Sequence, residues 1–279
     1  MDMYDKLLET SRFLENLNSS KAKVGVVLGS GLGNFVEELQ IDHEVPYETI
    51  PHFPVSTVKG HSGKLIFGSI GGKPVIAMSG RFHYYEGYSP EEVVFPIRVM
   101  KMLGIETVLI SNAAGGVNTK STPARSLKVG DLMIIRDHIS FAIVNPLLGK
   151  NDDRIGTRFP DMSEPYKKEL IEKAKAIAGR LSIDLKEGVY FGVTGPTFET
   201  RAEYQLISVL GADAVGMSTV QEVIAANHAG MNVFAMSVIT DIGTRDEENE
   251  ITHEEVLQAA REAEPKFSAV FRELIQELG

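Results

Sequence analysis

Short apolar runs and helical patterns alternate along the chain. Each apolar run is bounded by glycine or polar residues, which is typical of a strand buried inside a sheet. The predicted strands cover residues 24–28, 64–70, 73–78, 107–110, 131–136, 188–194, 212–218 and 233–239. Between them lie segments with apolar residues three or four positions apart, as in helices with one buried face. This alternation predicts an α/β fold with a parallel-rich central β-sheet and helices between its strands, and the length of the chain leaves one or two domains open.

Local signals place several boundaries of these elements. The Ser-Pro-Glu-Glu sequence at 89–92 and the Thr-x-x-Glu sequences at 200–203 and 252–255 are capping boxes, which mark the first turn of a helix. The pair at 71–72, Gly-Gly, separates two predicted strands and suits a two-residue hairpin. Pro265 falls inside the terminal helix and predicts that this helix is kinked or divided.

The polar stretch at residues 81–88, Arg-Phe-His-Tyr-Tyr-Glu-Gly-Tyr, directly follows a predicted strand. Strand ends are where α/β proteins place their sites. Because Arg81 and His83 are two positions apart in an extended segment, their side chains lie on one side of it. Arginine is suited to binding phosphate through two hydrogen bonds. We therefore expect an anion site here, with Glu86 orienting His83 or His61.

Other strand ends add candidate anion ligands. Gly29 to Gly33 form a glycine-rich turn whose backbone amides can approach a phosphate, and the Ser30 hydroxyl can donate to it. A dinucleotide fingerprint needs a further glycine where Asn34 stands, so the sequence leaves open a structural turn and an anion loop. Ala113 lies in a run of small residues at a strand end, and Ser218 stands at the start of a predicted helix.

His61 is a secondary candidate. It stands at the start of the predicted hairpin, so antiparallel pairing brings it near the Arg81 end of the second strand. A lone histidine in a loop is more often simply solvated.

A second group of residues suits a flat heterocycle. Phe198 and Glu199 lie in the turn before the helix that starts at Thr200, where a ring can stack and a carboxylate can accept from ring N–H groups. Glu199 equally suits the positive end of that helix, so both interpretations stay open. Asp241 ends the last predicted strand, where burial raises a carboxyl pKa and makes it a candidate general acid or base.

Composition narrows the classes of protein. The chain has a net charge of −10 and no cysteine, which makes a nucleic-acid duplex or an anionic membrane an unfavourable partner and excludes disulfides and thiolate metal sites. It has no run of 18 apolar residues, and its first residues lack the pattern of a signal peptide. We expect a cytoplasmic protein.

Phosphate ligands beside ligands for a purine-like base suggest that phosphate itself is the attacking reagent. The sequence shows no nucleotide-triphosphate loop, no metal-ligand cluster and no paired nucleophile and base. This combination indicates phosphorolysis of a nucleoside.

The chain resembles the trimeric purine nucleoside phosphorylases of the nucleoside phosphorylase superfamily. The resemblance rests on residues 29–33, 60–61, 81–87, 112–118 and 195–203, together with 211–222, and covers nearly the whole chain. It implies a phosphorylase/hydrolase-like α/β fold, a single domain over residues 1–279 with a mixed central β-sheet flanked by helices. It also implies a homotrimer, a purine nucleoside and phosphate as substrates, and no cofactor.

The resemblance also implies a role for each site residue. The phosphate ligands are Ser30, His61, Arg81, His83, the amide of Ala113 and Ser218; the ribose ligands are Tyr85, Met217 and His253; the base ligands are Phe198, Glu199 and Asp241. Asp241, Glu199 and His83 are the expected catalytic residues. Periodicity alone predicts that Phe159 is a loop aromatic tucked onto the core, whereas the resemblance assigns it to the ribose site of the neighbouring subunit.

One departure from the family leaves the base preference open. Members specific for 6-oxopurines carry asparagine at position 241, and the related methylthioadenosine phosphorylases carry aspartate, as this chain does. His253 matches the residue that meets the ribose 5'-hydroxyl, which favours nucleosides. The alternatives are a methylthioadenosine phosphorylase, a dinucleotide-dependent oxidoreductase built on residues 29–33, and a non-enzymatic purine sensor. The charged segment 245–250 is a candidate lid.

Overall fold

The computed structural model describes residues 1–18, 20–55, 62–117, 126–243 and 251–278. His61 and the candidate lid at 245–250 therefore lie outside the described residues. The α-helices are α1 (Met3–Glu15), α2 (Pro90–Met102), α3 (Lys168–Leu181), α4 (Arg201–Val209), α5 (Val220–His228) and α6 (His253–Glu277). The strands are β1 (Val24–Leu28), β2 (Gln40–Pro46), β3 (Lys64–Ile70), β4 (Lys73–Ser79), β5 (Thr107–Gly116), β6 (Leu132–Ile139), β7 (Leu185–Gly192), β8 (Ala214–Gly216) and β9 (Asn232–Ile242).

These strands form one mixed sheet in the order β2-β3-β4-β1-β5-β8-β7-β6-β9. Strand β1 pairs in parallel with β4 and β5, and β5 pairs in parallel with β9. Because β9 also pairs with β6, strands β5, β8, β7, β6 and β9 close into a ring at one end of the sheet. The predicted α/β fold with a mixed central sheet is confirmed.

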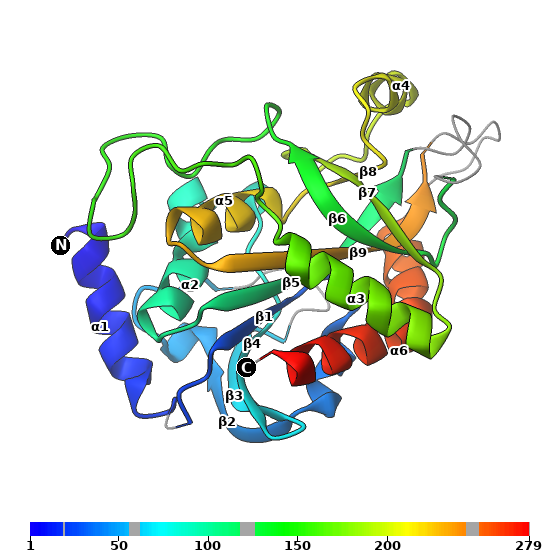
Figure 1. Ribbon diagram of the computed structural model, residues 1–279. Helices are drawn as coiled ribbons and strands as arrows, with labels where there is room; N and C mark the ends of the chain where they lie inside the picture. The colour runs from blue at the N-terminus through cyan, green and yellow to red at the C-terminus, as the bar shows by residue number, and fades with distance from the viewer. Residues whose placement is uncertain (19, 56–61, 118–125, 244–250, 279) are drawn as a thin grey trace.

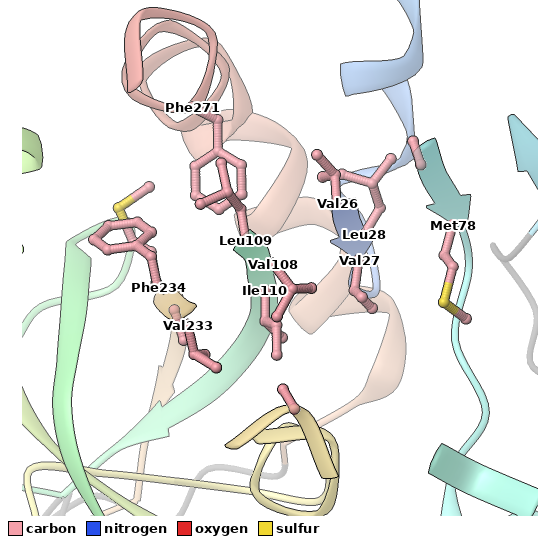
Figure 2. Close-up of a cluster of buried hydrophobic side chains, with 14 of the residues drawn as sticks. Val26, Val27, Leu28, Met78, Val108, Leu109, Ile110, Val233, Phe234 and Phe271 are labelled. Atoms are coloured by element: carbon pink, nitrogen blue, oxygen red, sulfur yellow. The ribbon is translucent and has the colours of Figure 1, made fainter. Parts of the chain in front are cut away.

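Helices cover both sides of this sheet (Figure 1). Helix α2 packs against α1 and α5, and α6 packs against α3 and β9 on the opposite side. The close-up of the core shows why the apolar runs become central strands. In β5, Leu109 points towards Phe271 of α6, whereas Val108 and Ile110 point to the other side (Figure 2). A strand that is buried on both faces needs a continuous apolar run, which is the pattern seen in its sequence.

Two strands at the site are longer than their apolar runs. Strand β5 continues through the small residues to Gly116, and β9 continues through Thr240 and Asp241 to Ile242. The two strands pair with each other along this whole length, so backbone pairing extends them beyond the hydrophobic signal. Residues 112–116, predicted to lie beyond the end of a strand, belong to β5 and pair with β9.

Other local predictions have mixed outcomes. The hairpin at 71–72 is confirmed, because β3 and β4 pair antiparallel around it and both glycines have positive φ, 55° and 79°. The division of the terminal helix at Pro265 is wrong: α6 runs as one helix through it. Buried residues on both sides of Pro265, among them Ala263 and Phe267, hold the two halves against the same core.

Candidate active site

A cavity of about 380 Å³ opens where β1, β4, β5, β8 and β9 bring their polar residues together. Most of the site residues predicted from the sequence line it. They are Ser30, Arg81, His83, Tyr85, Ala113, Phe198, Glu199, Met217, Ser218, Asp241 and His253. Segments from nearly the whole length of the chain therefore meet in one place.

Phe159 is the predicted site residue that the structure places elsewhere. Its side chain is 83% exposed and does not line the cavity of its own chain. The prediction that it tucks onto the core is therefore wrong. An exposed aromatic side chain is compatible with an interface between subunits.

Arg81 lines the cavity and is fully buried, with 1% of its side chain exposed. Its Nε and Nη2 donate to the two carboxylate oxygens of Glu222 at 3.1 and 2.9 Å. Its Nη1 donates to the backbone oxygen of Ser111 at 2.5 Å and to Oγ of Ser218 at 3.3 Å. Nε and Nη2, the pair of donors that we expected to bind an anion, are thus bonded to a carboxylate of the protein. Nη1 is directed to Ser218, which lines the cavity.

Glu222 is a functional residue that the sequence analysis missed. Besides holding Arg81, it accepts from the backbone N–H of Thr219 at 3.0 Å, as in a capping box of α5. Asn112 donates to the Thr219 hydroxyl at 2.8 Å. The available signal was the Thr-x-x-Glu spacing of residues 219–222, a fourth example of the capping pattern. Glu222 therefore fixes Arg81 and the start of α5 together.

His83 is held by a carboxylate and by a ring. Its Nδ1 lies 3.0 Å from Oε1 of Glu86, and its imidazole stacks on Tyr85 with centroids 4.6 Å apart. A carboxylate only accepts hydrogen bonds, so Nδ1 carries the proton. Burial lowers the pKa of His83, although Glu86 opposes that effect. Of the two expected partners for Glu86, the structure shows His83.

Two carboxyl groups, those of Glu199 and Asp241, line the same cavity. Asp241 is 5% exposed, and its Oδ1 accepts from the Thr240 hydroxyl at 3.1 Å. Burial raises the pKa of Glu199, and the negative charge of Asp241 raises it further. Phe198, 41% exposed, lies beside them in the cavity lining.

Tyr204 is the second residue that the sequence analysis missed. It lies on α4, is 2% exposed, and lines the cavity beside Glu199 and Asp241. The sequence shows it only as an apolar-face position of a helix, so nothing in the pattern separates it from a core residue.

Comparison with known proteins decides the family. The sequence profile of the phosphorylase superfamily matches residues 23–276. Purine nucleoside phosphorylase 1 of Bacillus subtilis is 46% identical over 273 residues, which cover 98% of both chains. The chain belongs to the purine nucleoside phosphorylase family. The family member from Rattus norvegicus is 45% identical over 95% of this chain and 92% of its own.

Solved structures of purine nucleoside phosphorylases share the fold. Isoform 2 from Schistosoma mansoni, in complex with cytosine and ribose-1-phosphate, superposes with a TM-score of 0.92 at 41% identity, covering 99% of this chain and 97% of that one. A Schistosoma mansoni purine nucleoside phosphorylase in complex with adenosine gives 0.91 at 39% identity, covering 99% and 98%. The mixed α/β architecture is therefore that of the purine nucleoside phosphorylases.

Proposed function

We propose that this protein catalyses the reversible phosphorolysis of purine ribo- and deoxyribonucleosides to the free base and the pentose 1-phosphate. The observation that carries the proposal is one cavity lined by a buried arginine, hydroxyl groups, two carboxyl groups and an aromatic ring. Family membership supports it, since the relatives compared above are named purine nucleoside phosphorylases. The same membership gives no support to an oxidoreductase.

The proposed phosphate ligands are Ser30, Arg81, His83, the Ala113 amide and Ser218, with His61 as a further ligand. Arg81 supplies fixed positive charge, because Glu222 and Ser111 leave its guanidinium a single position. Tyr85, Met217 and His253 are the proposed ribose contacts. Phe198 stacks on the base, while Glu199 and Asp241 bind its polar edge.

In the proposed reaction the glycosidic bond breaks and both of its electrons leave with the purine. The ribosyl group passes through a cation-like state, and a phosphate oxygen forms the new bond to the sugar carbon. A preorganised phosphate dianion stabilises that cation by a few kcal/mol, roughly. The departing purine is a poor anion, so its N7 needs a proton or a hydrogen bond. A protonated Asp241 donates a hydrogen bond to N7 of a 6-oxopurine, and Glu199 accepts from N1–H of that base. An ionised Asp241 accepts from a 6-amino group, and the N7 of that purine then takes its proton from solvent.

The proposal extends to the assembly and setting of the enzyme. We expect a homotrimer in which Phe159 reaches the ribose site of the neighbouring subunit, because its side chain is exposed on its own chain. We expect it to act in the cytoplasm, with phosphate as co-substrate and without a cofactor. In the described part of the chain, no helix has the length and apolar character needed to cross a membrane.

A methylthioadenosine phosphorylase is the second candidate, and Asp241 is the observation that favours it. The decisive experiment measures phosphate-dependent base release from inosine, adenosine and methylthioadenosine. We expect release from at least one of the two nucleosides at a higher kcat/KM than from methylthioadenosine. His253 lines the cavity, and its imidazole suits a 5'-hydroxyl better than a methylthio group. Release from methylthioadenosine alone would contradict the proposal.

A further inference from the structure

Tyr204 lies in the cavity wall next to Glu199 and Asp241, and the residues around it fix its position. A Cβ atom at Gly243 would lie 2.0 Å from two carbons of the Tyr204 ring, so the ring fits only because residue 243 has no side chain. A Cβ at Gly115 would lie 3.3 Å from the Tyr204 hydroxyl and 2.9 Å from Oδ2 of Asp241. The Tyr204 hydroxyl and Oδ2 of Asp241 therefore both lie next to Gly115 of β5, where there is no side chain.

The Tyr204 hydroxyl is buried beside the carboxyl groups of Glu199 and Asp241. Within the described residues it makes no hydrogen bond of regular geometry. Burial raises the pKa of the phenol, and the negative charges of Glu199 and Asp241 raise it further, so the hydroxyl keeps its proton and remains a donor. The carboxyl groups of both Glu199 and Asp241 act on this hydroxyl as hydrogen-bond acceptors, and carboxylates are strong acceptors for a buried donor.

The hydrogen-bonding groups of the purine explain how the Tyr204 hydroxyl can affect which base is bound. A 6-aminopurine offers N–H donors at its 6-substituent and an acceptor at N1, whereas a 6-oxopurine offers the reverse. An ionised Asp241 matches the amino group, and a protonated Glu199 matches the bare N1. A phenol that donates to Asp241 favours this arrangement, because it stabilises the ionised carboxylate.

We propose that Tyr204 is a specificity-determining residue that holds Asp241 as an ionised hydrogen-bond acceptor, so that the base site accepts the 6-amino group of a purine nucleoside. This inference rests on the proposed function and on the placement of Asp241 at the 6-substituent. Tyr204 acts through Asp241 and is a positioning residue. A purely structural Tyr204 would instead fill space among the apolar side chains it packs with, such as Ile207 and Val215.

The test compares kcat/KM for adenosine and inosine, at saturating phosphate, in the wild type, Tyr204→Phe, Asp241→Asn and the double variant. Tyr204→Phe keeps the ring against Gly243 and removes only the hydroxyl. We expect the adenosine-to-inosine ratio to fall about tenfold, since a hydrogen bond to a charged group is lost. In the Asp241→Asn background the same change should alter the ratio by less than about twofold, because the two residues act as a unit.

Tyr166→Phe is the matched control. Tyr166 is buried, and its hydroxyl lies 2.9 Å from Nδ1 of His138, away from the cavity. Removing this hydroxyl should leave the ratio unchanged.

Several outcomes overturn the inference. One is a wild type that releases base from inosine but not from adenosine, and another is an unchanged ratio in Tyr204→Phe. If Tyr204→Phe does not fold, the Asp241→Asn variant alone decides, and an unchanged ratio there also overturns it. A wild type that releases no base from any purine nucleoside defeats the proposed function itself, which separates the two failures.

Discussion

At the residue scale, the site depends on charges held in one geometry by buried partners. Arg81 and Glu222 are 1% and 3% exposed and form two hydrogen bonds with each other. The sequence predicted Arg81 as an anion ligand from its place after a strand. The Thr-x-x-Glu spacing of residues 219–222 could have identified Glu222 as a capping residue. Its pairing with Arg81, 141 positions away along the chain, has no signal in a single sequence.

The double role of Arg81 can be divided by mutation. Arg81→Ala leaves the Glu222 carboxylate buried without its cation, so we expect the free energy of unfolding to fall by about 3–5 kcal/mol and the KM for phosphate to rise. In Arg81→Ala/Glu222→Gln the stability should largely recover, because the unpaired charge is gone, whereas the KM for phosphate should not. Urea denaturation and initial rates measure the two effects. Recovery of both in the double variant would contradict a phosphate role for Arg81.

The pH profile reports the coupling between the two carboxyl groups. The pKa of Glu199 is raised above 4.5 by burial and by the charge of Asp241. When pH falls through this raised pKa, Glu199 is protonated and can no longer accept from N1–H of inosine, so kcat/KM falls on the acid side. Asp241→Asn removes one cause of the raised pKa, and the acid limb should move to lower pH. A limb that stays in place would show that Asp241 does not act on Glu199.

At the scale of elements, hydrophobic pattern located the central strands but not every end. The runs in β1, β5 and β9 were visible because these strands are buried on both faces. Strand β2 was missed because it lies at the edge of the sheet with nearly all its residues exposed, and so has no apolar run. The extensions of β5 and β9 were missed because they come from pairing between strands distant in sequence.

The start of α6 links helix capping to the cavity. The Thr252 hydroxyl accepts from the backbone N–H of Glu255 at 3.2 Å, and the next residue, His253, lines the cavity. Thr252→Ala should cost about 1 kcal/mol of stability and raise the KM for the nucleoside, because the first turn frays. Ser89→Ala removes the same kind of cap from α2, whose residues do not line the cavity, and is the control. Equal changes in KM in both variants would contradict a specific role for the first turn of α6.

At the scale of the whole molecule, the loop between β6 and α3 exposes large apolar side chains that contacts within one chain do not cover. Phe141, Leu148 and Phe159 on this loop are 70%, 68% and 83% exposed. Exposed large apolar side chains such as these are candidates for contact with a partner. The periodicity of apolar residues did not predict this exposure. An isolated aromatic residue in a loop has the same sequence pattern whether it packs on its own core or on a neighbouring subunit.

We therefore expect Phe159→Ala to act between subunits. Analytical ultracentrifugation should show a trimer for the wild type, and the variant should raise the KM for the nucleoside while leaving the KM for phosphate nearly unchanged. Phe13→Ala, at a 47% exposed position of α1, is the matched control and should change neither constant. A wild type that is a fully active monomer would refute the assignment of Phe159 to a neighbouring site.

The central claim is that phosphate, and not water, takes the ribosyl group from a purine nucleoside. The most direct measurement incubates the protein with inosine and adenosine, with and without inorganic phosphate, and quantifies free base and ribose 1-phosphate in the same samples. We predict equal amounts of base and ribose 1-phosphate from at least one nucleoside, and neither product when phosphate is omitted. Base released without phosphate, or no base from either nucleoside, would contradict the proposed function.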